Sequence, residues 1–301
     1  MEIKKRVLIE GKEITISNPD KVLYPQDSYT KWEYILHMAR LAPYMVPYCR
    51  NRYLTTIRYP DGITGKSFYQ KNIPSHAPEW VSSATDGKSQ YVLLQDTATL
   101  VWLANLACLE FHTSFDRTDA PGKPTELVFD IDPSVDDFDR VVEVALITRQ
   151  LLLELQLDGV VKTSGATGLQ IYVPIKPRYS FEETRKVNEF IARYLSSKYP
   201  KLITLERMVN KRGDKVYFDY LQHWEGKTLT APYSPRARPG APVSTPLLWE
   251  ELVPGLTPAQ FSLETIHERI DRLGDLFAPI SSPEDNYSLD EILLFIKSKG
   301  G

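Results

Sequence analysis

Two aspartates that could hold a divalent cation end a short apolar run near the middle of the chain. Residues 127–133 read LVFDIDP, so Asp130 and Asp132 lie two positions apart. In a β-strand such a pair points to one face, while Phe129 and Ile131 pack behind it. Two adjacent carboxylates repel each other, and a hard cation bound by their oxygens removes that cost. The motif therefore predicts a metal site, or alternatively two solvated acids where a strand ends in a turn.

A third carboxylate, Asp219, follows another apolar run at residues 215–218. If that run is a strand beside residues 127–132, three carboxylates meet on neighbouring strands of one sheet. Such a set suits two Mg²⁺ or Mn²⁺ ions that hold the attacking and leaving oxygens of a phosphoryl transfer. Taken alone, an acid such as Asp219 is more often a surface residue.

A glycine-hinged segment, KTSGATG at residues 162–168, is the third candidate. It is neither a Walker A loop nor a dinucleotide-binding GxGxxG motif. Its backbone N–H groups, with Lys162, Ser164 and Gly165, are suited to a phosphate. A simple hairpin turn is the alternative.

Two sets of cationic and polar residues are suited to nucleic acid and to triphosphate charge. Lysines interleaved with aromatic side chains fit a nucleic-acid backbone and a stacked base. The set near the N-terminus consists of Asn18, Lys21, Lys31, Lys66, Phe68 and Tyr69. The second set, which could neutralise a triphosphate, consists of Arg207, Lys211 and Arg236. For both sets a solvated charged face is the alternative.

Hydrophobic spacing predicts the elements that must position these residues. In the first third we expect a hairpin at 5–17, helices at 31–46 and 97–111, a strand at 53–59 and a loop at 61–79. In the middle we expect strands at 127–132, 160–163, 169–174 and 215–221, with helices from 136 or 137 to about 155 and at 181–198. This β-α-β-β-α-β order predicts a ferredoxin-like (RRM-like) sheet with helices on one face. After a Pro-rich connection, helices are expected at 258–272 and 288–298.

Composition excludes several classes of protein. The chain has 301 residues, a net charge of −3 and 42% hydrophobic residues, which argues against disorder and against a polycationic nucleic-acid wrapper. It has no apolar run long enough for a membrane span, and its start lacks the apolar segment of a signal peptide. The two cysteines are expected to be buried hydrophobes, no zinc spacing is present, and a reducing cytoplasm is the expected compartment.

Several of these segments together resemble the polymerase domain of bacterial ligase D, within the archaeo-eukaryotic primase superfamily. The similarity runs from about residue 6 to 255. It is carried by ISNPDKVLYP (16–25), FYQKNIPSHAPEW (68–80), LVWLANLACLEF (100–111) with His112, LVFDIDP (127–133), KTSGATGLQIYVP (162–174) and APYSPRAR (231–238).

The resemblance implies an α+β primase-polymerase fold, with an N-terminal α/β subdomain packed on an RRM-like catalytic subdomain. It implies one catalytic domain over residues 1–301, with the metal-binding core at about 120–225. The implied activity is template-directed addition of nucleotides, ribonucleotides preferred, at DNA ends and gaps with a 5′-phosphate during non-homologous end joining. Two divalent ions, Mn²⁺ or Mg²⁺, are the implied cofactors. NTP or dNTP, 5′-phosphorylated DNA ends, a Ku-like end-binding protein and a DNA ligase are the implied partners.

Site residues follow from the resemblance motif by motif. Asp130, Asp132 and Asp219 are expected to hold the metals, and His112 to line the nucleotide pocket. The triphosphate is expected to contact Lys162, Ser164, Gly165, Gln170, Arg207, Lys211 and Arg236. Asn18, Lys21 and Lys31 are expected to form the 5′-phosphate pocket, with Lys66 also on the DNA, and Phe68 and Tyr69 to stack where the template bends.

Two departures from the family keep other functions open. Gln170 stands where the family usually has His, and His223 where it usually has Asn. A glutamine amide cannot act as a general acid. A DNA-end-binding relative that lost catalysis through Gln170 is therefore one alternative, a de novo primase is another, and a metal-dependent phosphohydrolase is a more distant one. Nothing after residue 301 supplies a ligase or nuclease module, so a stand-alone polymerase or an excised domain is expected.

Overall fold

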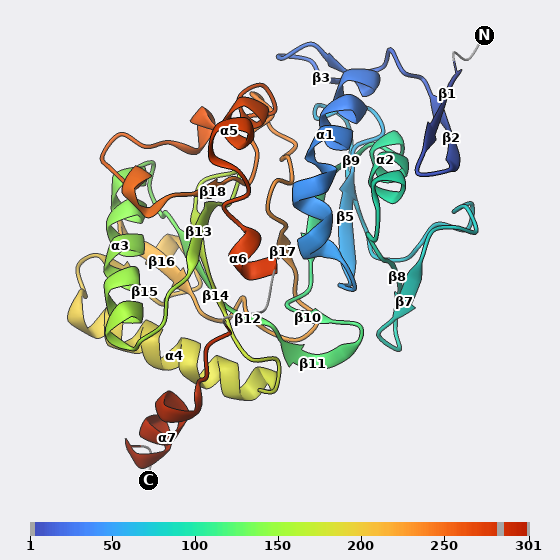
Figure 1. Cartoon of the computed structure of the whole chain (residues 1–301). Coiled ribbons are helices and arrows are strands. Elements are labelled where there is room, and N and C mark those ends of the chain that lie inside the picture. Colours follow the sequence, from blue (N-terminus) through green and yellow to red (C-terminus); the bar gives the residue numbers. More distant parts are fainter. Residues whose placement is uncertain (1–3, 282–285, 300–301) are drawn as a thin grey trace. The chain divides into compact units, whose positions relative to one another are not determined.

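The computed structural model describes residues 4–281 and 286–299, which fall into two compact units (Figure 1). The first unit takes its described residues from 1–114, 228–245 and 259–275. The second takes them from 115–227, 246–258 and 276–301. That the chain acts as one catalytic domain stays a prediction.

The second unit is built on a six-stranded sheet in the order β15-β16-β12-β14-β13-β18. Its central strands are β12 (Glu126–Asp132), β13 (Val160–Thr163), β14 (Leu169–Pro174) and β16 (Val216–Asp219), each antiparallel to its neighbours among these four. The short outer strands are β15 (Ile203–Thr204) and β18 (Pro246–Leu247). With helices after β12 and β14, this order confirms the predicted ferredoxin-like arrangement.

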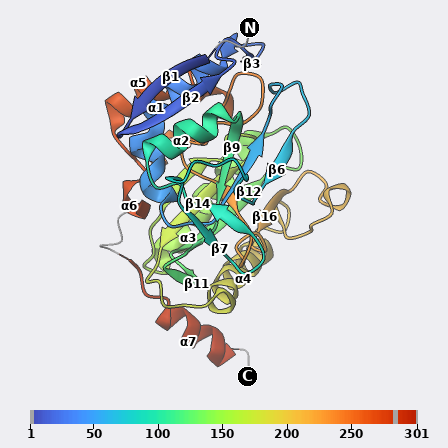
Figure 2. The ribbon, with the colours of Figure 1, turned by 90° about the vertical axis from the view of Figure 1, so that its right-hand side faces the viewer.

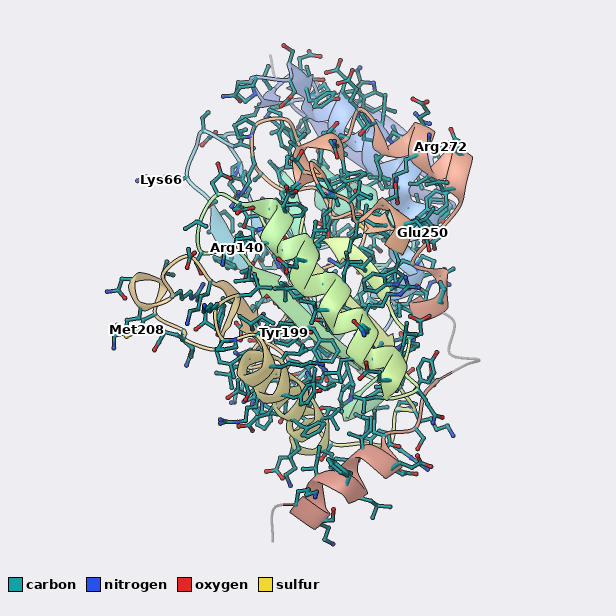
Figure 3. The ribbon with its side chains drawn as sticks, turned by 90° about the vertical axis from the view of Figure 1, so that its left-hand side faces the viewer. Lys66, Arg140, Tyr199, Met208, Glu250 and Arg272 are labelled. Atoms are coloured by element: carbon teal, nitrogen blue, oxygen red, sulfur yellow. The ribbon has the colours of Figure 1, made fainter. Side chains whose placement is uncertain are left out.

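Helices α3 (Phe138–Glu154) and α4 (Phe181–Lys198) lie together in front of this sheet in Figure 3, coloured green and yellow. Each begins at a polar cap. The Asp137 carboxylate accepts from the backbone N–H of Arg140, and Ser180 forms a capping box with Glu183. The start of α3 was predicted from an aspartate cap at 136 or 137, and the start of α4 from the amphipathic spacing of residues 181–198.

The remaining elements of the second unit are short. They are β10 (Asp116–Arg117), β11 (Ala120–Pro124), the 3₁₀ helices η1 (Val209–Lys211) and η2 (Trp249–Glu251), α6 (Ala278–Ser281) and α7 (Asp290–Lys299). A further 3₁₀ helix, η3, spans Pro258–Gln260.

The first unit has a sheet in the order β17-β9-β5-β8-β7, with β6 also paired to β5. Its strands are β5 (Leu54–Arg58), β6 (Phe68–Gln70), β7 (Ser83–Thr85), β8 (Gln90–Val92), β9 (Cys108–Thr113) and β17 (Leu229–Thr230). Two ribbons, β1 (Lys4–Ile9) with β2 (Lys12–Ser17) and β3 (Val22–Tyr24) with β4 (Tyr29–Thr30), precede it. The helices are α1 (Lys31–Cys49), α2 (Thr97–Asn105) and α5 (Ile266–Leu273). Figure 2 shows the β1–β2 ribbon beside α2, where the Asn105 amide donates to the Thr15 carbonyl.

Three sequence predictions of elements were wrong in part. The helix expected at 97–111 ends at Asn105, and β9 follows, because apolar residues alone do not separate a buried helix from a buried strand. The loop expected at 61–79 contains β6. The helix expected from 258 begins only at Ile266. Within 4–281 and 286–299, no helix is long and apolar enough to cross a membrane.

Candidate active site

One rung of the second unit's sheet carries four polar residues across four strands. Lys162 on β13 lies opposite Gln170 on β14, Gln170 opposite Asp130 on β12, and Asp130 opposite Asp219 on β16. Residues directly opposite each other in antiparallel strands project from the same face. The sheet therefore brings the lysine, the amide and two of the expected metal ligands into one row. We call these four residues the polar rung.

Hydrogen bonds link the first three members of the polar rung. Lys162 Nζ donates to Gln170 Oε1 at 2.5 Å, and Gln170 Nε2 donates to Asp130 Oδ1 at 2.9 Å. Only 0% of Lys162, 2% of Gln170 and 8% of Asp130 is exposed. Gln170 thus joins a buried cation to a buried carboxylate through the two ends of one neutral amide.

The carboxylate of Asp130 is held in an unfavourable electrostatic environment. Burial raises its pKa well above the ordinary value, and the nearby charges of Asp132 and Asp219 raise it further. The bond from Gln170 and the charge of Lys162 act in the opposite direction but do not cancel the increase. A positive charge placed among these carboxylates would relieve the repulsion.

The turn between β13 and β14 approaches Asp132 at Gly168. A Cβ atom at Gly168 would lie 2.7 Å from Asp132 Oδ1 and 2.5 Å from the Ile131 carbonyl oxygen, so only glycine fits. The Ser164 hydroxyl accepts from the N–H groups of Ala166 and Gly168 and closes the turn, in which Gly165 has a φ of +70°. The Ser164 side chain therefore stabilises the turn. The part of the turn that lies next to the Asp132 carboxylate is the backbone of Gly168.

Cationic residues surround Asp219. Arg185 and Lys227 both donate to the Leu221 carbonyl, and the Leu221 N–H donates to Asp219 at 3.0 Å. Arg207 and Lys211, both expected at the triphosphate, are exposed on the segment before β16.

Arg212, which sequence reasoning missed, holds this segment in place. Its guanidinium lies 3.8 Å from the centre of the Tyr217 ring and donates to the carbonyls of Glu206 and Arg207. Figure 3 shows Met208 at the outer side of the same segment. The segment contains Arg207, Lys211 and Arg212, and the sequence alone does not indicate which of them packs on Tyr217.

The carboxylates of Asp130, Asp132 and Asp219 are suited to a divalent cation that takes its remaining ligands from water and substrate. Among residues 4–281 and 286–299, no group of three or more His, Cys, Asp or Glu side chains is arranged so that it could hold a metal ion by itself. Mg²⁺ in phosphoryl-transfer enzymes commonly takes one or two carboxylates and completes its shell with water and substrate phosphate oxygens. Asp130 and Asp132, with Asp219 on the next strand, offer the hard oxygen donors that such a shell requires.

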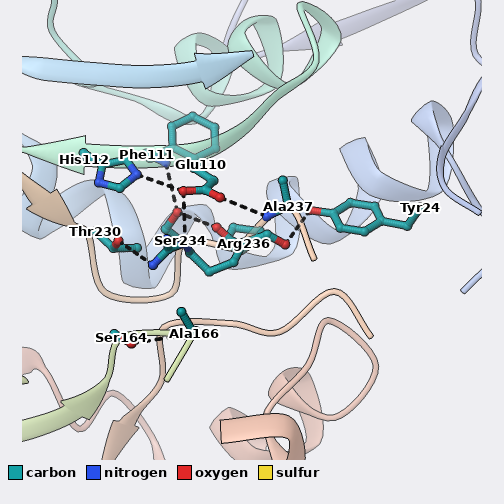
Figure 4. A network of polar contacts seen from close by, with 11 residues as sticks. Tyr24, Glu110, Phe111, His112, Ser164, Ala166, Thr230, Ser234, Arg236 and Ala237 are labelled. Atoms are coloured by element: carbon teal, nitrogen blue, oxygen red, sulfur yellow. Dashed lines mark hydrogen bonds and ion pairs between the residues drawn. The ribbon is translucent and has the colours of Figure 1, made fainter. Parts of the chain in front are cut away.

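A second polar network lies in the first unit, around the strand that carries His112 (Figure 4). His112 Nε2 and Glu110 Oε2 are 3.1 Å apart, and Arg236 Nε lies 3.0 Å from the same carboxylate oxygen. The other oxygen of Glu110 accepts from the N–H of Ala237, and Arg236 also donates to Thr230. Burial alone would raise the pKa of Glu110, but the bond from His112 and the charge of Arg236 outweigh it and lower the pKa.

Glu110 was missed by sequence reasoning, although it contacts two of the residues that were expected at the nucleotide, His112 and Arg236. The available signal was an acidic residue two positions before His112 inside an otherwise apolar strand, CLEFHT. Residues two apart on a strand share a face. The ionised carboxylate therefore orients the imidazole and the guanidinium of Arg236 together.

The residues expected at DNA differ in their exposure. Lys31 is 5% exposed, and its ammonium donates to Ser17 Oγ and to the carbonyl and side-chain oxygens of Asn105. Lys21 is partly exposed and pairs with Asp61 at 2.6 Å. Asn18 is exposed, with a positive φ of 48°, and its carbonyl accepts from the N–H of Lys21. Of the three expected phosphate ligands, only Lys21 brings a charged group to the surface.

The expected stacking residues lie on an open strand edge. Phe68 and Tyr69 on β6 are 45% and 73% exposed, and Arg58 lies 5.2 Å from the centre of the Phe68 ring. Arg58 is held by the Leu106 carbonyl and by Gln70, so it supports the Phe68 ring. Figure 3 shows Lys66, on the preceding loop, extending outward from the ribbon.

His223, which departs from the family pattern, has a structural role. Its Nε2 lies 2.9 Å from the Glu126 carbonyl oxygen, and its ring packs against Phe115 and Phe181. Burial lowers its pKa to about 3. The ring is therefore neutral, and it ties the segment after β16 to the start of β12, the strand of the aspartates.

An α+β chain with a ferredoxin-like sheet, and with acidic and cationic residues aligned on one rung of it, has the features of a primase-polymerase type of nucleotidyl-transfer domain. The model of the LigD primase-polymerase domain matches residues 30–277, and the chain belongs to this family.

Curated relatives and a solved structure agree with the family. The chain is 39% identical over 282 residues to the bifunctional non-homologous end joining protein LigD of Bacillus subtilis, covering 93% of the chain and 46% of that protein. It is 33% identical to the multifunctional LigD of Mycolicibacterium smegmatis, covering 89% of the chain and 36% of that protein. The polymerase domain of Mycobacterium tuberculosis ligase D, solved in complex with DNA, superposes with a TM-score of 0.84 at 33% identity, covering 89% of this chain and 98% of that one. The chain therefore spans less than half the length of these two curated relatives.

Proposed function

We propose that this chain is a template-directed nucleotidyltransferase that extends DNA ends and fills gaps during non-homologous end joining. The polar rung carries the proposal, because it aligns the buried carboxylate of Asp130 and the partly buried carboxylate of Asp219 with a lysine on the sheet of a primase-polymerase family member. The names of the relatives, which are end-joining proteins, support the biological setting. Such work takes place at the nucleoid, in the bacterial cytoplasm.

The proposed chemistry is in-line attack of a primer 3′-hydroxyl on the α-phosphate of a nucleoside triphosphate. Two Mn²⁺ or Mg²⁺ ions, when held by Asp130, Asp132 and Asp219, would activate the hydroxyl and neutralise charge on the leaving pyrophosphate. The protein contributes position and charge rather than a nucleophile. Gln170 orients Asp130 through its hydrogen bond, and Lys162 supplies positive charge on the same rung of the sheet.

Other residues are proposed to bind the substrates. Gly165 and its turn, with the cationic side chains, would contact the triphosphate, and His112 the sugar or triphosphate. Lys21 is proposed to bind a downstream 5′-phosphate, with Asn18 and Lys31 shaping its surroundings and Lys66 on the backbone. Phe68 and Tyr69 would stack on the template. The expected preference for ribonucleotides, a Ku-like partner and a DNA ligase belong to this proposal.

A primer-extension assay on gapped DNA tests the function. The gap carries a downstream 5′-phosphate or 5′-hydroxyl, and NTPs or dNTPs are supplied with Mn²⁺ or Mg²⁺. We expect templated addition that is faster with ribonucleotides and with the 5′-phosphate. Synthesis on single strands without a primer would instead favour a primase. Binding of phosphorylated ends without nucleotide incorporation would favour an end-binding protein.

A further inference from the structure

The ammonium of Lys21, the exposed cation of the expected phosphate pocket, forms an ion pair with a carboxylate of the same unit. Lys21 Nζ lies 2.6 Å from Asp61 Oδ1, and the side chains are 36% and 75% exposed. The ammonium of the other expected lysine, Lys31, is buried and donates to Ser17 and Asn105. An arriving phosphate therefore meets a cation whose charge is balanced by Asp61.

The position of Asp61 is set by the backbone and not by a long flexible side chain. Residues 59–62 form a turn with proline at its second position, closed by a bond from the Gly62 N–H to the Tyr59 carbonyl. The next residue, Ile63, donates to the Leu23 carbonyl on β3 at 2.9 Å. A Cβ atom at Gly62 would lie 2.8 Å from that same oxygen, so glycine allows the turn to lie directly against β3.

We propose that Asp61 is a built-in competitor for the phosphate site and is displaced when a terminal 5′-phosphate binds Lys21. The inference rests on the proposed recognition of a 5′-phosphate by Lys21. A phosphate monoester carries a charge of about −1.5 to −2 at neutral pH, so it outcompetes a carboxylate of charge −1. A 5′-hydroxyl has no charge with which to displace Asp61. In the absence of a phosphorylated end, Asp61 balances the charge of Lys21.

Removing the competitor should tighten binding of phosphorylated DNA and change its salt dependence. Breaking an exposed ion pair of this kind costs free energy when the phosphate binds. A variant without the pair should therefore bind phosphorylated DNA about two- to fivefold more tightly. In the wild type, salt also weakens the Lys21–Asp61 ion pair that the phosphate has to break, which offsets part of the salt-dependent loss of DNA affinity. Asp61→Asn lacks this offset, so the slope of log K against log salt should become steeper, by less than the value of about 0.9 for a whole phosphate contact.

The experiment measures dissociation constants by fluorescence anisotropy on gapped DNA with a 5′-phosphate or a 5′-hydroxyl at several salt concentrations. The variants are Asp61→Asn, Lys21→Met and the double variant. Asparagine is suited to the turn at position 61 because it favours turns as aspartate does. Asp20→Asn is the matched control, since Asp20 is exposed and adjacent to Lys21 and the change in net charge is the same.

We expect Asp61→Asn to tighten binding of the 5′-phosphate DNA only, to steepen its salt slope, and to have no effect when Lys21 is methionine. Equal gains on both DNAs, or an equal gain from Asp20→Asn, would overturn the competitor role by showing a general charge effect. Weaker binding by Asp61→Asn would overturn it by showing that Asp61 orients Lys21. If wild type and Lys21→Met bind both DNAs equally, the proposed phosphate site itself fails, which is a different result.

Discussion

Replacing Gln170 by methionine removes the bridge between two buried charged side chains while keeping a side chain of similar length. The native amide accepts from Lys162 at 2.5 Å and donates to Asp130 at 2.9 Å. A thioether cannot donate and is only a weak acceptor. The variant therefore leaves a buried lysine and a buried aspartate each with one charge-assisted hydrogen bond fewer.

The expected cost follows from these two bonds. Hydrogen bonds to charged groups contribute about 1.5–3 kcal/mol each, so Gln170→Met should lower the free energy of unfolding by about 3–6 kcal/mol at an alkaline pH at which Asp130 is ionised. Urea unfolding in EDTA, followed by circular dichroism, measures this change. Gln150→Met is the matched control, because Gln150 is exposed on α3. Changes at such positions usually stay within about 0.5 kcal/mol.

A second substitution at position 170 distinguishes the effect of the two hydrogen bonds from the effect of side-chain packing. Neutral imidazole has one donor and one acceptor nitrogen, so Gln170→His can in principle keep both bonds. Stability and primer-extension rate should both rank wild type and Gln170→His above Gln170→Met, because the same bonds orient Asp130. A Gln170→Met protein that is as stable and as active as the wild type would refute the proposed role of the amide.

The remaining predictions concern Asp130, His223 and Arg58. Because burial and neighbouring carboxylates raise the pKa of Asp130, the folded form without metal loses stability as the pH rises above about 4, the ordinary pKa of aspartate. Asp130→Asn should therefore melt above the wild type at pH 8 in EDTA, and the difference should shrink towards pH 4; a lower melting temperature at pH 8 would contradict this. Burial lowers the pKa of His223 to about 3, so below about pH 6.5 the unfolded chain binds the proton first and stability falls by up to about 1.4 kcal/mol per pH unit. His223→Asn should flatten that slope in acid titrations followed by circular dichroism, and an unchanged slope would count against it. Arg58→Met should weaken binding of gapped DNA about two- to fivefold by removing the cation under the Phe68 ring, measured by anisotropy; unchanged binding would show that the ring needs no support.

Local patterns were enough to predict the sheet of the second unit and two of its aspartates. The caps at Asp137 and Ser180 fix where α3 and α4 begin, and the spacing of Asp130 and Asp132 fixes their shared face. Each of these signals depends on residues within one turn of helix or one strand. The ferredoxin-like order followed from the sequence of such elements.

Contacts between residues far apart in the chain could not be predicted in this way. Arg236 meets Glu110 on β9, Asp61 meets Lys21, and the ammonium of Lys31 is used by Asn105. Local periodicity carries no information about such pairs. It also failed at β9, where an apolar run after α2 reads equally well as helix or strand.

The most direct test of the account is the rate of nucleotide addition by variants of the proposed metal ligands. Wild type, Asp130→Asn, Asp219→Asn and the control Asp136→Asn are compared on gapped, 5′-phosphorylated DNA with Mn²⁺ and NTPs. Asp136 is an exposed acid just beyond the end of β12. The account predicts templated addition by wild type and Asp136→Asn, and only enzyme-free background from the other two. Addition at the wild-type rate by Asp130→Asn or Asp219→Asn would contradict the assignment of the carboxylates to the metal ions.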